Sequence, residues 1–163
     1  MISTAHENTV LKVGDKAPEF ALPDVLSGEI VRSADLLGSP VLLYFARGTW
    51  CPTCRRWMLQ IAERLPELQK RGVRVVAVVA QKAASAAVDL RDDPYPFPVL
   101  SDASRTVVKE YGVYVRANFE SLNIARPSTF VIDAKGIVRL MHVASIQFEF
   151  ASWDEIFATF DKL

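Results

Sequence analysis

The sequence has few of the residues that build disulfide frameworks and metal sites. It contains two cysteines and two histidines among 163 residues. Cys51 and Cys54 are separated by only two residues, so a bond between them would close too short a loop to restrain the unfolded chain much. A zinc site needs about four ligands, and no second cysteine pair accompanies His6 and His142. These scarcities exclude a disulfide-stapled scaffold, and we expect neither a metal nor another cofactor.

The chain also lacks an excess of either charge and any long apolar run. Nineteen Lys and Arg balance nineteen Asp and Glu, so no net field draws the protein to nucleic acid or to an anionic membrane. No apolar run approaches the roughly 18 residues that cross a bilayer, and residues 1–8 lack the order of a signal peptide. We therefore expect a cytoplasmic protein that binds neither nucleic acid nor membrane.

Apolar residues, by contrast, are plentiful. They make up 50% of the chain, which is enough for a well-packed core. The length of 163 residues fits one domain, since typical domains have about 100–200 residues. The sequence therefore predicts an N-terminal tail over residues 1–12 and a single domain over residues 13–163.

Strand and helix patterns alternate along this domain. Strands over 20–22 and 30–32 flank a Ser-Gly-Glu turn and predict an N-terminal hairpin. The continuous apolar run 41–45 predicts a central strand that is buried on both faces. The other predicted elements are helices over 51–71, 83–90, 103–111 and 152–162, strands over 73–79 and 98–100, and a hairpin with strands over 129–132 and 137–141, while 113–125 stays unassigned.

This order of elements predicts the fold class. Strands that alternate with helices imply parallel pairing in the first half of the chain, and the closing hairpin adds antiparallel strands. We therefore predict a three-layer α/β sandwich in which helices cover a mixed central sheet.

A Cys-x-x-Cys pair at the start of the predicted helix 51–71 carries the chemistry. Pro52 suits the first helical position, which leaves the Cys51 sulfur facing unpaired N–H groups and the positive end of the helix dipole. Both features favour a thiolate, and Arg47 adds positive potential. Cys51 is therefore the predicted nucleophile, and Cys54, one turn along, is the thiol that attacks an oxidised Cys51.

A second interpretation is two inert buried cysteines. The setting argues against it, because an aromatic-Cys-Pro-x-Cys sequence directly after a buried strand and at a helix start indicates a redox motif. The charged residues Asp89, Arg91 and Asp92 are interpreted as solvent-exposed, and His142 as structural.

Four segments together resemble a known family. They are Gly-Asp-Lys-Ala-Pro-Glu-Phe at 14–20, Arg-Gly-Thr-Trp-Cys-Pro-Thr-Cys-Arg at 47–55, Phe-Pro-Val-Leu-Ser-Asp at 97–102 and Arg-Pro-Ser-Thr-Phe-Val-Ile-Asp at 126–133. In this order they resemble the peroxiredoxin-like proteins of the alkyl hydroperoxide reductase C and thiol-specific antioxidant (AhpC/TSA) group. The resemblance implies a thioredoxin-like fold and a thiol-dependent antioxidant oxidoreductase.

The resemblance also implies a site and its partners. The partners would be a hydroperoxide or disulfide substrate and a thioredoxin- or glutathione-type reductant, with monomer and homodimer both open. Pro127 resembles the cis-proline that thioredoxin-fold proteins place against the active-site disulfide. The implied site consists of Cys51 and Cys54 with supporting residues Arg47, Thr49, Trp50, Pro52, Arg126 and Pro127.

The chain departs from the peroxiredoxin motif P-x-x-x-T-x-x-C. A gap-free match places the cysteine of the motif on Cys54, its threonine on Cys51 and its proline on Arg47. The peroxidase arginine of the family falls on Pro127, with Arg126 one position early. The donors that activate a peroxide must therefore be arranged differently here, because a peroxidase stabilises charge on both peroxide oxygens.

The chain also departs from thioredoxin, because the run 41–45 lacks the buried carboxylate of that protein. Three functions stay open: a thiol peroxidase, a protein disulfide reductase and a redox-inert binding domain. The chain length, the N-terminal hairpin and segment 97–102 resemble the peroxidase group more than small thioredoxins, so the peroxidase is the leading prediction.

Overall fold

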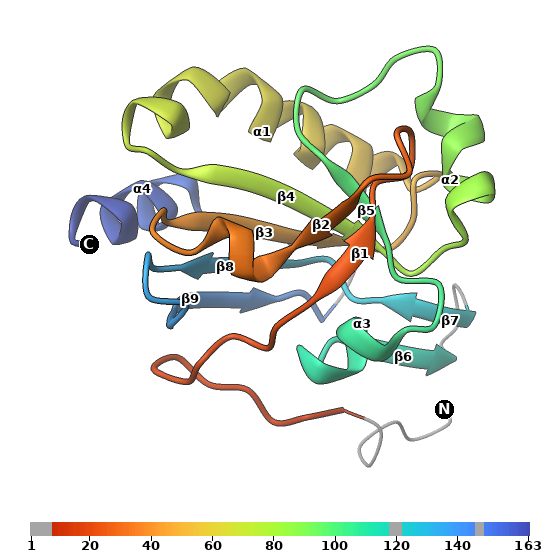
Figure 1. Cartoon of the computed structure of the whole chain (residues 1–163). Helices are drawn as coiled ribbons and strands as arrows, with labels where there is room; N and C mark the ends of the chain where they lie inside the picture. Colours follow the sequence, from red (N-terminus) through yellow and green to blue (C-terminus); the bar gives the residue numbers. More distant parts are fainter. Residues whose placement is uncertain (1–7, 118–121, 146–148) are drawn as a thin grey trace.

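The computed structural model describes residues 8–117, 122–145 and 149–163, so residues 1–7 of the predicted tail lie outside it. Its centre is a five-stranded sheet in the order β5-β4-β3-β8-β9 (Figure 1). Strands β3, β4 and β5 are parallel, whereas β8 and β9 are antiparallel to their neighbours. The predicted mixed sheet is confirmed. The strands are β3 (Val41–Ala46), β4 (Arg74–Val79), β5 (Val99–Ser101), β8 (Ser128–Ile132) and β9 (Val138–Val143).

Helices cover both faces of this sheet, as the predicted three layers require (Figure 1). Along β3, Leu42 and Tyr44 pack in the same core as α1, while Leu43 and Phe45 pack in the core on the opposite face. Because successive side chains of a strand point to opposite faces, a strand buried on both faces must be apolar throughout. Helices α1 (Pro52–Lys70), α2 (Ala83–Leu90) and α4 (Trp153–Asp161) share the first core, and α3 (Thr106–Glu110) packs in the second.

The N-terminal hairpin is confirmed. Its strands β1 (Ala21–Pro23) and β2 (Ile30–Arg32) pair antiparallel, and a 3-10 helix, η1 (Ser33–Leu36), follows. The hairpin lies beside the β5 edge of the sheet, where the Val25 N–H donates to the Val99 carbonyl at 2.8 Å. It therefore covers an edge that would otherwise be open to pairing with another chain.

The third predicted helix is shorter than expected. The sequence pattern predicts a helix over 103–111 capped by Ser101 and Asp102, but α3 begins only at Thr106. Arg105 has a left-handed backbone with φ of 62°, which interrupts helical geometry before Thr106. The Asp102 carboxylate instead accepts a hydrogen bond from the Val108 N–H at 2.8 Å, so it stabilises the start of α3 from a preceding turn.

The unassigned segment 113–125 contains a second hairpin. Strands β6 (Tyr114–Ala117) and β7 (Leu122–Ala125) pair antiparallel outside the central sheet. The sequence between them, residues 118–121, has no Asn-Gly or Asp-Gly dipeptide, so the usual hairpin signal is missing. Asn8 binds this hairpin from far away in the sequence, since its amide donates to the Tyr114 carbonyl at 3.0 Å.

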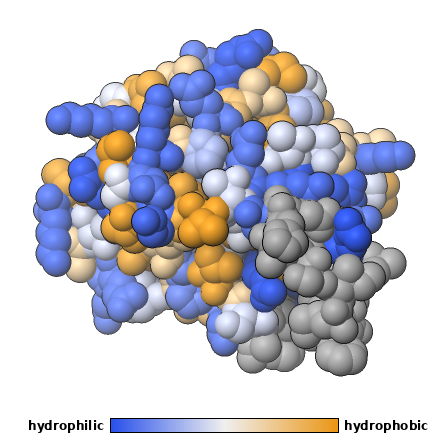
Figure 2. Space-filling view, turned by 90° about the horizontal axis from the view of Figure 1, so that it is seen from below, coloured by the Kyte–Doolittle hydropathy of each residue, from blue (hydrophilic) through white to orange (hydrophobic). Residues whose placement is uncertain are grey.

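The face of the molecule below the sheet in Figure 1 is mainly hydrophilic, with apolar side chains in small groups (Figure 2). The N-terminal segment runs along this side of the molecule (Figure 1). It carries two exposed apolar side chains, Val10 and Val13. Among the described residues, no helix has both the length and the apolar character to span a membrane.

Candidate functional site

Cys51 lies at the N-terminal end of α1, where the loop after β3 becomes helical. It is the N-cap residue, with φ of −76° and ψ of 116°, and Pro52 occupies the first helical position as predicted. The Cys51 sulfur accepts a hydrogen bond from the Cys54 N–H at 3.4 Å. A sulfur atom thus takes the place of the oxygen that usually caps a helix, and it faces the positive end of the helix dipole.

This position stabilises Cys51 as a thiolate. Its pKa is lowered from 9.0 to about 5, first by a hydrogen bond from the Cys54 thiol and then by the Thr53 hydroxyl. The Thr53 oxygen lies 3.3 Å from the Cys51 sulfur. The Cys54 N–H and the positive charge of Arg47 lower the pKa further, whereas burial opposes them. At neutral pH Cys51 is therefore predominantly a thiolate.

The first prediction concerns the pH dependence of Cys51. In a Cys54→Ala variant, which keeps the helix N-terminus but lacks the neighbouring thiol, alkylation by iodoacetamide should still titrate with a pKa below the usual value of about 8.5. In the native protein the rate should rise through pH 5, because the Cys51 pKa is about 5, and level off above it. Rates measured between pH 4 and about 10 test both expectations. A native profile that titrates near 8.5 would contradict the thiolate assignment.

Cys54 lies behind Cys51 in the first turn of α1 and has no exposed surface. Its sulfur accepts a hydrogen bond from the Arg47 N–H at 3.4 Å. The pKa of Cys54 is raised, because it donates to the Cys51 sulfur, because it is buried and because the Cys51 charge repels a second thiolate. The pair therefore consists of a reactive thiolate and a protonated partner thiol, and both cysteines are free.

The second prediction is a reversible disulfide between these two residues. Mild oxidation by peroxide or by oxidised glutathione should join Cys51 to Cys54, since their sulfur atoms are already hydrogen-bonded neighbours. Mass spectrometry of the intact protein should show the loss of two hydrogen atoms and their return after reduction. Two free thiols under both oxidants would contradict a redox function.

The loop between β3 and α1 places a buried cation beside the pair. The Arg47 side chain is only 6% exposed, and its guanidinium lies 4.9 Å from the centre of the Trp50 ring. Trp50 is 43% exposed and forms the outer side of this contact. A Cβ at Gly48 would overlap the Trp50 indole, so any side chain at this position would displace the Trp50 ring. The role of Gly48 has no signal in the sequence, since it depends on the fold of the loop.

Thr49 anchors the loop to the neighbouring parallel strand. Its N–H donates to the Gln81 side-chain oxygen at 2.8 Å, and its hydroxyl donates to the Asp89 carboxylate at 2.7 Å. Gln81 follows β4 and Asp89 lies in α2, so these bonds connect two segments that the sequence separates by 32 and 40 residues. Asp89 is exposed, as predicted, but it also holds the loop, which the sequence analysis did not identify.

Arg126 and Pro127 lie at the end of the sheet from which β3 leads to the cysteines. The register shows this, because Ser128, the first residue of β8, pairs with Phe45 near the end of β3. Pro127 is buried. The Arg126 guanidinium is directed to the Ser145 carbonyl oxygen at 3.5 Å. The arginine whose charge lowers the Cys51 pKa is instead Arg47.

The Arg126–Pro127 peptide bond is trans, so the expectation of a cis-proline is wrong. Trans is the intrinsically favoured form of an X-Pro bond by about 0.5–1 kcal/mol. The flanking backbone is also held in place, because the Arg126 N–H donates to Val113 at 2.8 Å and the Pro127 carbonyl accepts from Ala144 at 2.9 Å.

Within residues 8–117, 122–145 and 149–163, no three His, Cys, Asp or Glu side chains lie together in a way that could hold a metal ion. His142 lies on β9, and His6 lies outside the described residues.

Comparisons with known proteins identify relatives among both peroxiredoxins and thiol-disulfide oxidoreductases. The profile of the AhpC/TSA family matches residues 13–141. The chain is 32% identical over 135 residues to peroxiredoxin Bcp of Escherichia coli K12, and the matched segment covers 82% of this chain and 85% of the relative. It is 35% identical over 134 residues to the thiol-disulfide oxidoreductase ResA of Geobacillus thermodenitrificans, with 82% and 70% covered. The solved structure of peroxidoxin BcpB from Mycobacterium tuberculosis has a TM-score of 0.81 at 26% identity, over 94% of this chain and 99% of that one.

Proposed function

Because the chain belongs to the AhpC/TSA family, we propose that it reduces small hydroperoxides through a Cys51–Cys54 dithiol–disulfide cycle. The protein is a thiol-based oxidoreductase with a thioredoxin-like fold, and its relatives include peroxiredoxins. One observation carries the assignment of residues: the Cys51 thiolate caps α1 while the protonated Cys54 thiol lies directly behind it.

The first step is nucleophilic attack on the peroxide. The Cys51 thiolate attacks the terminal peroxide oxygen, an S–O bond forms, the O–O bond breaks and the alcohol leaves after taking a proton from solvent. Negative charge moves from sulfur to the departing oxygen. The donors that surround the Cys51 sulfur are the Thr53 hydroxyl and the Cys54 N–H, with the Arg47 charge nearby. We propose that these groups replace the missing proline and threonine of the peroxiredoxin motif.

The second step forms the disulfide. Cys54 attacks the sulfenic acid on Cys51, an S–S bond forms, and the departing hydroxide takes the Cys54 proton and leaves as water. An external thiol of thioredoxin or glutathione type then reduces the disulfide by exchange. The proposed supporting residues fall into two groups. The loop and helix-start contacts described above involve Thr49, Trp50 and Pro52, whereas the adjacent end of the sheet carries Arg126 and Pro127.

The absence of a structural disulfide framework supports a cytoplasmic location.

Burial favours a small oxidant over a protein substrate. Cys51 has no exposed surface, and a small hydroperoxide requires less opening of the surrounding side chains to reach it than a protein disulfide does. The likeness to ResA keeps protein disulfide reduction as the second candidate.

Stopped-flow oxidation of the reduced protein by hydrogen peroxide, beside an insulin-reduction assay, distinguishes the two candidate functions. Fast peroxide oxidation is expected, and faster insulin reduction would overturn the proposal.

A further inference from the structure

Tyr44 carries a buried polar group with no structural explanation in the fold. It lies in the middle of β3 and is 1% exposed, within the core that contains both cysteines and α1. Among the described residues its hydroxyl makes no hydrogen bond of standard geometry. A buried hydroxyl usually has a partner, because losing water without replacement is unfavourable. An unpaired one therefore calls for a functional explanation.

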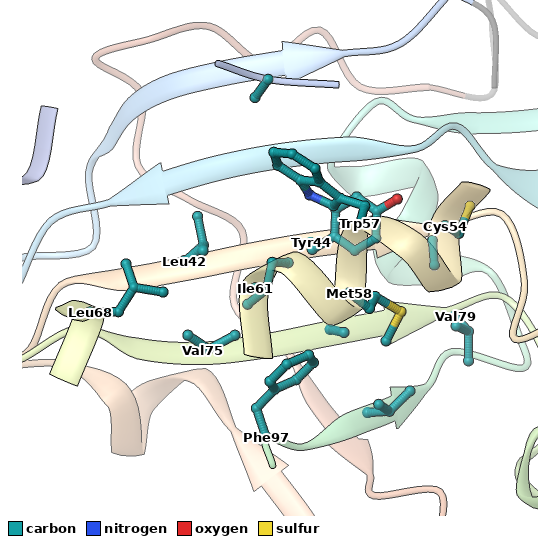
Figure 3. Close-up of a cluster of buried hydrophobic side chains, with 14 of the residues drawn as sticks. Leu42, Tyr44, Cys54, Trp57, Met58, Ile61, Leu68, Val75, Val79 and Phe97 are labelled. Carbon is teal, nitrogen blue, oxygen red and sulfur yellow. The ribbon is translucent and has the colours of Figure 1, made fainter. Parts of the chain in front are cut away.

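The neighbour of this hydroxyl is the partner thiol. Figure 3 shows Tyr44 beneath α1, with its oxygen directed toward the end of the helix that carries Cys54. The two groups are close enough to affect each other, since Cys54 adds to the effect of burial in raising the Tyr44 pKa, and the Tyr44 hydroxyl in turn lowers the Cys54 pKa. Because its pKa is raised, the phenol keeps its proton at neutral pH, so it can donate that proton in a hydrogen bond to a Cys54 thiolate but cannot act as a base.

We propose that the Tyr44 hydroxyl donates a hydrogen bond to the Cys54 thiolate that is released when the Cys51–Cys54 bond breaks. This inference rests on the proposed dithiol–disulfide cycle, but it does not depend on which oxidant starts that cycle.

The step in which this donor acts is the reduction of the disulfide. An external thiolate attacks Cys51, a new S–S bond joins the reductant to Cys51, and the Cys51–Cys54 bond breaks with its electron pair on Cys54. The leaving Cys54 thiolate arises in a buried place, where an unsolvated charge is unfavourable. Two donors face it there, the Arg47 N–H at 3.4 Å and the Tyr44 hydroxyl. When a second thiolate of the reductant attacks the mixed disulfide, Cys51 leaves as a thiolate and Cys54 takes a proton from solvent.

The test is Tyr44→Phe with Tyr111→Phe as its matched control. Tyr111 is also 1% exposed, but it lies in the core on the other face of the sheet, and its hydroxyl donates to Pro18 at 2.8 Å. Each protein is oxidised with diamide, and the rate of reduction by dithiothreitol is followed. Tyr44→Phe should slow this reduction about tenfold, because hydrogen bonds to charged groups are the stronger kind. Tyr111→Phe should leave the rate within about twofold of the native one, because it removes a neutral hydrogen bond remote from the cysteines.

A second readout separates this role from a structural one. Alkylation of Cys51 by iodoacetamide at pH 7 should change by less than about twofold in Tyr44→Phe, since Cys51 depends on other donors. Tyr44→Phe should also melt no lower than the native protein, because its hydroxyl has no well-formed partner to lose. The proposal would be overturned if Tyr44→Phe and the native protein were reduced at equal rates. It would also be overturned if Tyr44→Phe slowed the alkylation of Cys51 as much as it slowed the reduction of the disulfide. A protein inert to peroxide would refute the peroxidase function and leave this test intact.

Discussion

Cys51→Ser is expected to lower the rate of hydroperoxide reduction by at least about 10³-fold, because it removes the thiolate that is predicted to attack the peroxide. A serine hydroxyl at the same helix N-cap keeps the cap hydrogen bond but is not ionised at neutral pH. Consumption of hydrogen peroxide in the presence of excess dithiothreitol is the measurement. The cap is retained, so the variant should melt close to the native temperature, which separates loss of chemistry from loss of fold.

Cys54→Ser is the matched comparison for this variant. It retains the Cys51 thiolate and should complete one rapid reaction with peroxide in a single-turnover experiment, with a sulfenic acid as the product rather than a disulfide. The gap-free match to the peroxiredoxin motif makes the opposite prediction, because it places the attacked cysteine on Cys54. A fast first turnover in Cys51→Ser and none in Cys54→Ser would reverse the assignment.

Arg47→Met is expected to slow the reaction of Cys51 with peroxide by about 10²–10³-fold, the usual loss when one donor to a developing charge is removed. Arg47 is the arginine whose charge lowers the Cys51 pKa, and it is held almost fully buried against Trp50. Methionine keeps much of the apolar contact with Trp50 while it removes the charge. Stopped-flow fluorescence at several pH values gives the rate and the Cys51 pKa together.

Two other variants make the Arg47 result specific. Arg47→Lys keeps the charge and should recover part of the rate, whereas Arg74→Met should change it little, because Arg74 begins β4 at the opposite end of the sheet. Arg126→Met should have a smaller effect than Arg47→Met, since its guanidinium is directed to Ser145. A larger effect of Arg126→Met would show that the charge reaches the peroxide from the β7–β8 connection instead.

The parts of this protein that local sequence could predict are those controlled by neighbouring residues. The apolar run 41–45 had to become a strand buried on both faces, because no polar side chain interrupts it. Pro52 after Cys51 marked a helix start, and the cap geometry follows from this within one turn. Hence the fold class could be predicted from patterns a few residues long, and so could the position of both cysteines at the start of α1.

Other features depended on contacts between residues that are distant in the chain. The Thr49 hydroxyl binds Asp89 across 40 residues, and no local pattern distinguishes that aspartate from other exposed ones. The Arg126–Pro127 bond was expected to be cis from the family pattern, but backbone bonds from Val113 and Ala144 accompany the trans form. Long-range packing of this kind brings together groups whose sequence spacing carries no information. Only the tertiary structure could therefore place Tyr44 near Cys54 and bury the predicted Arg47 against Trp50.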